Sequence, residues 1–362
     1  MNILLIGEAS GVHRNLAKGL RALGHKALHM TQSASTSWQW MDGSFSPDWP
    51  GLLGGIARNV MPFIRIAQLP HFDVANYVNT ITTVHGLHTR YLDLPLIRRK
   101  VDVMSYYALG CDEIGLIRRN PMLPYAPCET CIASRDTLAR DCEGALNPRF
   151  ERSREQVQRT FDLGSACMLE YSHVADLFPG RFRPIPFPVD VDPIVFEPAT
   201  SAPRTRIIHT PTRRGFKGTA VVLEAMAIVA SLRDDFDFQV VEGLSYPDYL
   251  DAVRGCDIVI DQVHSQSPGM NGLEMLAAGK IVLSGATPLG NAFFPFMAHT
   301  PMFDASPDPA ILAAGVCGLL DRKAEFPALA QAGRDYVARN HDCVAVAKQF
   351  LDHWQTAQTD QQ

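Results

Sequence analysis

The sequence has no run of about 18 apolar residues, so it predicts no membrane-spanning helix. Residues Met1–Gly7 are apolar but lack a basic segment and a cleavage site, so we expect no secretory signal peptide. There is no basic excess either, because 33 Lys and Arg stand against 38 Asp and Glu. The net charge of −5 therefore argues against nucleic acid as the main partner. We expect a cytoplasmic protein, compatible with peripheral contact with a membrane surface.

Internal repeats of the solenoid type and low-complexity tracts are also missing. The first glycine loop, Gly7–Gly11, lacks the full glycine pattern of a dinucleotide site, which weakens a nicotinamide interpretation. The chain has 362 residues, 46% of them hydrophobic, a length and composition typical of two globular domains. Its eight cysteines are expected as thiols or metal ligands rather than disulfides in a reducing compartment.

The first half opens with the pattern of a Rossmann-like unit. Ile3–Ile6 reads as a short buried strand, Val12–Leu23 has helical spacing and ends before Gly24, and Lys26–Met30 reads as a second strand. The rest of this half is predicted to hold strands at 73–78, 101–107 and 167–170 and helices at 151–163 and 172–177.

Two stretches of the first half have no regular pattern. Residues 31–60 carry three tryptophans among Ser, Gly and Pro, and we interpret them as a long active-site loop with some helix or, equally, as a core-packing flap. Residues 113–150 are irregular, with clustered prolines and cysteines, and the proline-rich segment 181–192 is expected to cross between the domains.

Strands and helices alternate clearly in the second half, which predicts a parallel sheet covered on both faces. Ligands of such sheets lie beyond the carboxyl ends of the strands, here at His209, Glu242, Asp261 and Ser284. The predicted strands are 206–209, 236–241, 257–261 and 280–284, and the predicted helices are 219–232, 245–254, 271–278 and 342–356.

A basic loop follows the first of these strands. Arg213, Arg214 and Lys217 lie between a strand end and the helix expected from Thr219. The first N–H groups of a helix and the positive end of its dipole attract anions, and the three side chains add full charges. The loop therefore suits a diphosphate, with a basic surface loop as the alternative.

A second segment, Gln266–Lys280, places small residues before a helix that carries one acid, Glu274. Such a carboxylate can accept hydrogen bonds from a ribose diol. It can also simply complement the helix dipole, and on its own that second interpretation would be preferred.

Together the two segments resemble the retaining family-four glycosyltransferases of GT-B fold, the group 1 glycosyl transferases. In that family a basic Arg…Lys-Gly stretch binds the donor diphosphate, and a Glu-x7-Glu motif followed by Ala-Met-Ala-x-Gly-Lys/Arg-Pro-Val binds the sugar and the ribose. Lys217-Gly218 matches the first motif, and Arg213 or Arg214 matches its arginine. Glu274-Met275-Leu276-Ala277-Ala278-Gly279-Lys280-Ile281-Val282 follows the second closely. Gln266 departs from it, because glutamine stands where the family has the acid that contacts the sugar.

The resemblance also implies roles in the first half, which in the family holds the acceptor. Gly11 would lie in the glycine loop between the domains. The family's His-Gly-x-Asp stretch reads Leu109-Gly110-Cys111-Asp112 here, so Asp112 could still face the reacting sugar, and His85 is a second candidate histidine unless it is structural. The implied catalytic residues are His85, Asp112, Lys217 and Gln266. The implied donor-binding residues are Gly11, His209, Arg213, Arg214, Lys217, Glu242, Gly269, Met270, Asn271 and Glu274.

The cysteines of the irregular stretch could form a structural metal site. Cys128 and Cys131 have Cys-x-x-Cys spacing, and with Cys111 and Cys142 they could hold one zinc ion tetrahedrally. Ordinary buried thiols are the alternative. A redox pair is disfavoured, because the motif is not expected to open a helix after a strand.

The sequence thus predicts an α/β protein of GT-B fold, with two Rossmann-like domains facing across a cleft. Residues 1–187 would bind the acceptor and contain a cysteine-rich insertion at about 111–142, 188–342 would bind the donor, and 343–362 would pack back on the first domain. The expected function is transfer of a sugar, with retention, from a UDP- or GDP-sugar to a glycan, lipid or protein acceptor. A sugar-nucleotide epimerase and a non-catalytic sugar-nucleotide or partner-binding protein are the alternatives.

Overall fold

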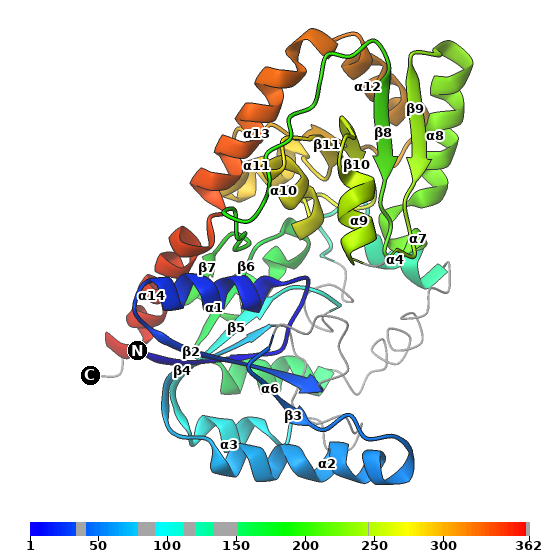
Figure 1. Ribbon diagram of the computed structural model, residues 1–362. Coiled ribbons are helices and arrows are strands. Elements are labelled where there is room, and N and C mark those ends of the chain that lie inside the picture. The colour runs from blue at the N-terminus through cyan, green and yellow to red at the C-terminus, as the bar shows by residue number, and fades with distance from the viewer. Residues whose placement is uncertain (34–40, 79–90, 112–119, 134–150, 245, 360–362) are drawn as a thin grey trace.

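The computed structural model describes residues 1–33, 41–78, 91–111, 120–133, 151–244 and 246–359. Two α/β units lie one above the other, each built on its own sheet (Figure 1). The predicted GT-B architecture is confirmed, since both sheets are parallel in every pairing and have helices packed against them.

The first unit holds a seven-stranded sheet in the order β3-β2-β1-β4-β5-β6-β7. This continues the strand order of a doubly wound dinucleotide-binding sheet, with its order reversing between β1 and β4. The strands are β1 (Asn2–Ile6), β2 (Lys26–Ser33), β3 (Gly43–Ser46), β4 (Phe72–Val78), β5 (Val101–Ala108), β6 (Leu163–Ala166) and β7 (Phe182–Pro184). Its helical segments are α1 (Val12–Ala22), α2 (Gly51–Gln68), α3 (Leu94–Arg98), α4 (Pro127–Ala133), α6 (Glu151–Thr160) and the 3-10 helix η3 (Leu169–Leu177).

The second unit holds a five-stranded sheet in the order β12-β11-β10-β8-β9, whose order reverses between β8 and β10. The strands are β8 (Thr205–His209), β9 (Phe236–Val240), β10 (Ile258–Ile260), β11 (Ile281–Ser284) and β12 (Phe303–Asp304). The helical segments are α7 (Arg214–Lys217), α8 (Thr219–Leu232), α9 (Tyr246–Val253), α10 (Met270–Ala277), α11 (Pro288–Phe293), η4 (Pro295–Met297), α12 (Pro309–Leu320), η5 (Lys323–Glu325), α13 (Phe326–Asn340) and α14 (Cys343–Thr359).

The strands form because they are short apolar runs that can be covered on both faces. Residues 3–6 of β1 and all of β10 and β11 are buried, which only a strand between two helical layers tolerates. Open parallel sheets bind ligands where the strand order reverses, beyond the carboxyl ends of the strands. The two such points are the loops after β1 and β4 and the loops after β8 and β10.

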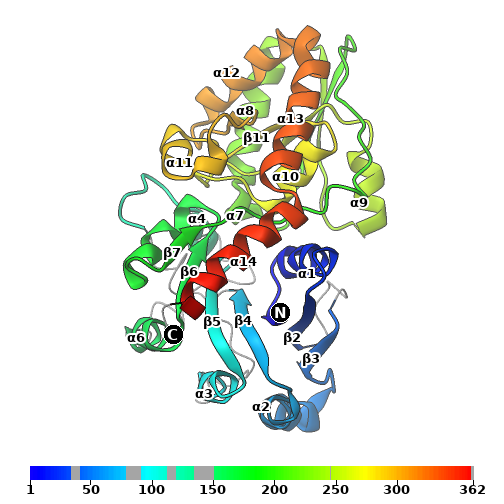
Figure 2. The ribbon, with the colours of Figure 1, turned by 90° about the vertical axis from the view of Figure 1, so that its left-hand side faces the viewer.

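The last helix, α14, returns to the first unit and runs along α1 and the strands β5 and β6 (Figure 2). Phe350 meets Tyr107 of β5 edge to face with ring centroids 5.0 Å apart, and Trp354 is fully buried. Gly19 allows the close approach of α1, because a Cβ there would lie 2.1 Å from the carbonyl oxygen of Cys343. The C-terminal segment thereby connects the two units a second time.

Most of the predicted elements are confirmed, and the errors lie in the first half. Residues 31–60 are not mainly loop, because they hold β3 and the first half of the 18-residue helix α2. The strand predicted at 167–170 is wrong; β6 ends at Ala166, and η3 begins at Leu169. The proline-rich segment 181–192, which was expected to cross between the domains, includes the edge strand β7. Proline is tolerated on an edge strand, where its missing N–H breaks no hydrogen bond of the sheet. In the described part of the chain, no helix is long and apolar enough to span a membrane.

Candidate functional site

The loops after β8 and β10 meet at a buried ion pair. The Lys217 ammonium donates to Oδ1 of Asp261 at 2.8 Å and to Oε1 of Gln262 at 3.1 Å. Asn271, in the first turn of α10, donates to the same Oδ1 at 2.9 Å, and Ser284 donates to Oδ2 at 3.0 Å. Three side chains from three separate segments of the second unit thus donate to one carboxylate at the point where the strand order reverses.

Asp261 is fully buried and ionised. Burial alone would raise the pKa of its carboxyl, but the charge of Lys217 and the hydrogen bonds from Lys217, Asn271 and Ser284 outweigh burial and lower the pKa. The carboxylate fixes the Lys217 ammonium beside the start of α10, since a Cβ on Gly269 would lie 3.8 Å from Oδ2 of Asp261. The sequence did not single out Asp261 beyond its place at a strand end.

Gly218 has a physical reason to follow Lys217. Its φ of 74° lies in the left-handed region, and it ends α7 and begins α8 at once. A Cβ there would also lie 2.2 Å from Cγ2 of Val263. Both the conformation and the space therefore require glycine in the turn that brings Lys217 to Asp261.

Two helices begin beside this ion pair without a side-chain cap. The residues before α8 and α10 are Gly218 and Gly269, and neither helix start receives a side-chain hydrogen bond. In contrast, Thr287 caps α11 and Asp308 caps α12. Uncapped first-turn N–H groups are the usual donors to a bound phosphate. The two starts and Lys217 therefore bring backbone donors and one cation close together.

Glu274, on the second turn of α10, is an acid with a strongly shifted pKa. Burial raises the pKa of its carboxyl to about 7, opposed only by the charge of Arg14 on α1. Among the described residues, no hydrogen bond or ion pair to this carboxylate is found. A half-buried carboxyl with open acceptor positions is suited to binding hydroxyl groups of a ligand.

The two arginines of the basic loop have different surroundings. The Nη1 of Arg213 lies 3.2 Å from Sγ of Cys111 in the first unit, and its guanidinium stacks 4.1 Å over the ring of Phe216. The exposed Arg214 instead pairs with Glu242 across the end of β9, with Nε 3.0 Å from Oε2. The structure therefore leaves Arg214 as the arginine at the solvent-facing side of the loop.

His209 is buried, and both of its ring nitrogens are engaged. Nδ1 donates to the carbonyl of Ile260 at 2.7 Å, and Nε2 accepts from the Thr219 hydroxyl at 2.9 Å. These two hydrogen bonds hold His209 between β10 and the first residue of α8, next to the turn at Gly218. Met270 is buried in the core, whereas Asn271 links three loops by also contacting Thr210 and Tyr249.

Gln266 is buried at the contact between the two units. Its backbone N–H donates to Oε1 of Glu170 at 2.6 Å, and its side-chain amide donates to the carbonyl of Tyr125 at 3.4 Å. Ser265 also donates to Glu170, and the Leu169 N–H donates to Ser267 Oγ at 2.8 Å. The first unit thus holds the loop that carries Gln266. Glu170 was missed from the sequence, because no local pattern marks a contact spanning 96 residues.

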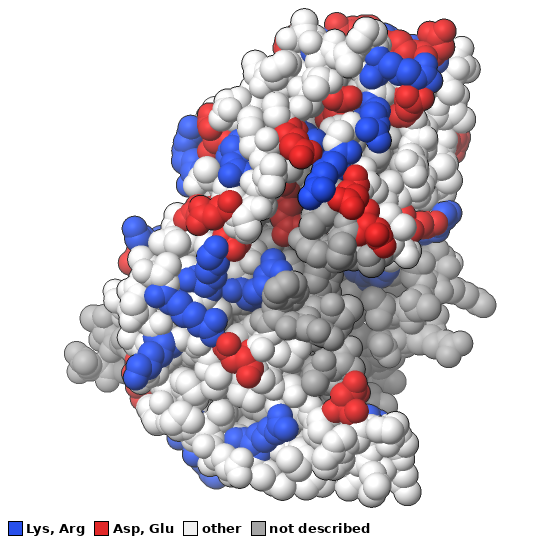
Figure 3. Space-filling model, in the orientation of Figure 1, with Lys and Arg blue, Asp and Glu red and all other residues white. Residues whose placement is uncertain are grey.

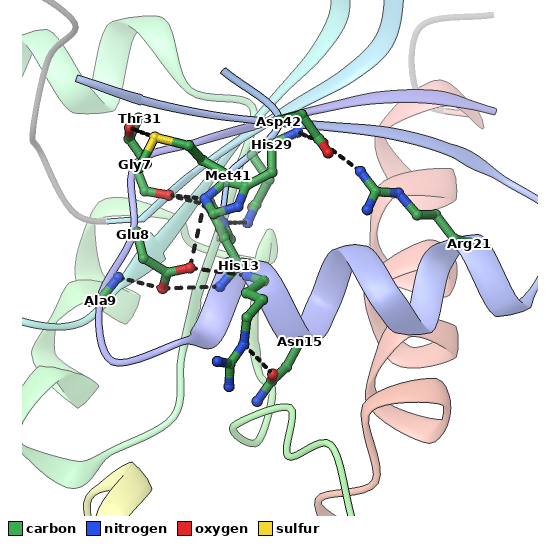
Figure 4. A network of polar contacts seen from close by, with 12 residues as sticks. Gly7, Glu8, Ala9, His13, Asn15, Arg21, His29, Thr31, Met41 and Asp42 are labelled. Atoms are coloured by element: carbon green, nitrogen blue, oxygen red, sulfur yellow. Dashed lines mark hydrogen bonds and ion pairs between the residues drawn. The ribbon is translucent and has the colours of Figure 1, made fainter. Parts of the chain in front are cut away.

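The glycine loop after β1 is stabilised internally. Glu8 accepts from the N–H groups of His13 and Arg14 at 3.4 and 3.0 Å, replacing the cap that Gly11 cannot supply. The Gly7 carbonyl accepts from the rings of His13 and His29 at 2.9 and 3.0 Å (Figure 4). Because Glu8 already satisfies the start of α1, this loop offers a phosphate less than α8 and α10 do.

The predicted cysteine site is not supported by the structure. Cys111, Cys128 and Cys131 lie close enough to influence one another's charge, and none is in a disulfide. Burial raises the pKa of Cys128 to about 12, and the Arg213 guanidinium points at two of the sulfurs, which opposes a dication there. No group of three or more metal-binding side chains is found within the described ranges. Cys128 and Cys131 lie on the short helix α4, which begins at Pro127 after an irregular stretch and not directly after a strand. Cys142, His85 and Asp112 lie outside the described residues.

Residues 218–352 match the family described as "Glycosyl transferase-like". A comparison with curated proteins found no match. The Anabaena protein HepE (Alr3699), solved in complex with UDP-glucose, is similar along 98% of this chain and 100% of its own, with 13% identity and a TM-score of 0.63. The sucrose-phosphate synthase of Thermosynechococcus elongatus has 12% identity and a TM-score of 0.63 over 99% of this chain and 100% of its own.

A glycosyltransferase from Rickettsia africae is similar as well, with 13% identity and a TM-score of 0.56 over 98% of each chain. At such identities the likeness to these structures shows the fold. Together with the family match, it confirms the resemblance to the group 1 glycosyl transferases inferred from Lys217-Gly218 and the Glu274 segment.

Proposed function

We propose that this chain, a GT-B protein whose second half matches the glycosyl transferase-like family, transfers a sugar from a nucleotide-diphosphate sugar to an acceptor, with retention. The observation that carries the proposal is the convergence of Lys217, two uncapped helix starts and Glu274 where the order of the second sheet reverses. This arrangement provides the donors for a diphosphate and an acceptor for a sugar hydroxyl at the ligand-binding edge.

The diphosphate would lie over the starts of α8 and α10. Lys217 already stands there, and Arg214 can turn from Glu242 to the phosphates, because that pair is exposed and exchanges readily with solvent. Glu274, one turn further along α10, would accept the ribose hydroxyls. UDP is the nucleotide we favour, since HepE was solved with UDP and with UDP-glucose, and GDP is the alternative in the test.

The chemistry then needs mainly positioning and charge stabilisation. As the bond between the anomeric carbon and the diphosphate oxygen breaks, negative charge grows on the leaving phosphate, where Lys217 and the helix starts stabilise it. The acceptor hydroxyl adds to the same face of the sugar and passes its proton to the leaving phosphate oxygen, which gives retention without a side-chain base. His85 and Asp112 remain predicted contacts of the reacting sugar.

The acceptor would bind to the first domain, residues 1–187, opposite the donor domain, residues 188–342. The glycine loop at Gly11 and the first turn of α1 would face the donor site, because Arg14 influences the charge of Glu274 across the two units. The acceptor class, a glycan, a lipid or a protein, is left to the experiment.

Two observations favour a non-catalytic sugar-nucleotide binding protein as the second candidate. The side chain of Gln266 is directed to Tyr125, and Leu109, which stands at the family's histidine, is buried in the core. Neither residue supplies the side chain that the family uses at the transferred sugar.

Incubation with a panel of UDP- and GDP-sugars, following release of UDP or GDP, separates the two candidates. Transfer or slow hydrolysis with one donor is expected, and NMR of the product's anomeric centre should show the donor's configuration. Tight nucleotide binding without turnover of any donor or acceptor would establish the binding protein instead. An inverted product would overturn the retaining mechanism alone.

A further inference from the structure

Arg213 has sulfur atoms for neighbours, where several other arginines of the second unit have acids. Figure 3 shows basic and acidic side chains interspersed over this unit, and Arg204 with Asp237 is one of the ion pairs between them. The Nη1 of Arg213 instead lies 3.2 Å from Sγ of Cys111 and 4.0 Å from Sγ of Cys131. In the described part of the chain, its guanidinium has no acidic partner. One guanidinium nitrogen thus stands beside two thiols.

The two cysteines come from separate segments of the first unit. Cys111 follows the carboxyl end of β5, whereas Cys131 lies on α4. Both sulfurs are close to the same nitrogen, so they are also close to each other, and neither is in a disulfide. Helix α4 packs against α7, the short helix that begins directly after Arg213 (Figure 1). The thiols therefore lie where the first unit meets the basic loop of the second.

The guanidinium makes these thiols more reactive than ordinary buried ones. A cation beside a cysteine favours the thiolate, which is the form that reacts with oxidants. Burial alone would lower the pKa of Arg213, but the charge and hydrogen bond of Cys111, and then the charge of Cys131, outweigh burial and raise it. The guanidinium and the sulfurs therefore stabilise each other's charged forms. Cys111 is also half-buried, not fully buried, so a small oxidant can reach it.

The Cys-x-x-Cys pair on α4 is a weaker candidate for oxidation. Cys128 is buried, and burial raises the pKa of its thiol to about 12, which the nearby charge of Arg213 offsets only in part. No hydrogen bond from Arg213 to this sulfur is found among the described residues, in contrast to those to Cys111 and Cys131. Cys128 therefore stays a protonated thiol under conditions in which the other two can react.

We propose that Cys111 and Cys131 form a redox-modification site, at which hydrogen peroxide converts the two thiols into a reversible disulfide. The Cys111 thiolate attacks one peroxide oxygen, the O–O bond breaks, and the departing hydroxide takes up a proton to give water. The Cys131 thiolate then attacks the sulfur of the resulting sulfenic acid, whose oxygen leaves as a second water. Two thiols and one peroxide thus give one disulfide and two waters, and the two sulfurs lose two electrons to oxygen. The proposal goes beyond sugar transfer and does not depend on it.

The disulfide would also change how the two units meet. Its sulfurs are neutral, so Arg213 loses the charged partners that hold it against the first unit. Arg213 directly precedes α7, and Lys217 ends that helix. In the oxidised protein, α7 therefore packs less firmly on α4. The contact between the units at the basic loop then depends on the redox state of two cysteines.

The test is treatment of the reduced full chain with equimolar hydrogen peroxide, followed by alkylation of the remaining thiols and peptide mapping by mass spectrometry without reductant. We expect a link between Cys111 and Cys131 that dithiothreitol removes. Cys317 on α12, which is partly exposed like Cys111, is the matched control and should stay unlinked. Arg213→Gln should slow formation of the link about tenfold, because the thiolate loses its cation. Arg204→Gln should form it at the original rate.

Cys131→Ser keeps the proposal testable if Arg213→Gln does not fold. Its reaction should stop at the sulfenic acid of Cys111, which dimedone traps, and no link should form. No disulfide, a disulfide between any other two cysteines, or equal rates for folded Arg213→Gln and Arg204→Gln would overturn the proposal. Hydrogen–deuterium exchange of residues 214–217 tests the consequence for α7. Faster exchange in the oxidised protein is expected, and equal exchange in both forms would refute the loosening of α7.

Discussion

The backbone N–H of Gln266, in the second unit, donates a 2.6 Å hydrogen bond to the carboxylate of Glu170, in the first. The contact is buried, and it joins the two units at the loop that carries Gln266, for which the sequence resemblance predicts a contact with the transferred sugar. Ser265 donates to the same oxygen, while Oε2 of Glu170 has no partner among the described residues. The position of the Gln266 loop therefore depends on how the two units pack. We expect donor binding to depend on the same carboxylate.

Replacing Glu170 tests this coupling. Glu170→Ala would leave the buried N–H of Gln266 without an acceptor, which costs about 1–3 kcal/mol, and would release the loop. We expect a lower free energy of unfolding in urea and at least a several-fold weaker affinity for UDP in calorimetry. Glu170→Gln keeps an acceptor oxygen and should recover most of both. Glu224→Ala, an exposed acid on α8, is the control; wild-type UDP affinity in Glu170→Ala would refute the coupling.

Arg214 and Arg204 form a matched pair on the second unit. Both are exposed arginines bound to one exposed acid, Glu242 and Asp237 respectively, but only Arg214 lies in the loop beside Lys217. We expect Arg214→Ala to weaken UDP binding about tenfold, the loss of a charge-assisted phosphate contact, and Arg204→Ala to leave it unchanged. Neither should measurably alter thermal stability. Equal affinities of the two variants would remove Arg214 from the diphosphate site.

The Lys217–Asp261 pair should behave as a unit. Removing either partner leaves a buried charge unpaired, which costs about 3–5 kcal/mol, so Lys217→Met and Asp261→Asn should each destabilise the protein strongly. The double variant should be less unstable than the sum of the two, with a coupling energy above about 1 kcal/mol. Urea unfolding of the original protein, the two single variants and the double variant measures this coupling energy. Strict additivity would contradict the ion pair. UDP affinity is informative for the donor site only in variants that remain folded.

Sequence patterns predicted the strands of the second half up to β11 and the helices between them, because β8, β10 and β11 are short apolar runs that are mostly buried. They did not predict β12, α11, α12 and α13. They failed where the physical signal was ambiguous. Most large apolar residues of α2 are exposed, and the helix contains several glycines and Pro62, so the sequence of its first half, residues 51–60, resembles a loop. Lys217 was expected as a diphosphate ligand on motif alone, but its partner Asp261 depends on two strands meeting in space. Glu170 could not be found at all, since its role depends on how the two units pack.

The raised pKa of Glu274 predicts that the free energy of unfolding and the affinity for UDP both depend on pH. Its pKa is raised from 4.5 to about 7 by burial, so the folded protein holds this proton more tightly than the unfolded chain does. The stability that Glu274 contributes is therefore complete below about pH 4.5 and is lost as the pH rises through about 7. Glu274→Gln, which stays neutral, should match the original protein near pH 4.5 and exceed its free energy of unfolding by about 2–3 kcal/mol at pH 8.

The same variant should bind UDP more weakly at pH 8, because a neutral amide accepts the ribose hydroxyls less strongly than a carboxylate. Below pH 7, nucleotide binding to the original protein should release a proton from Glu274, since the ligand favours the ionised form. Calorimetry in two buffers of different ionisation enthalpy measures that release, and Glu274→Gln should abolish it. Glu224→Gln, at an exposed acid on α8, should change neither the unfolding curve nor the proton release. Unfolding free energies of Glu274→Gln and the original protein that run parallel between pH 4.5 and 8 would show that this carboxyl is not the buried acid described here.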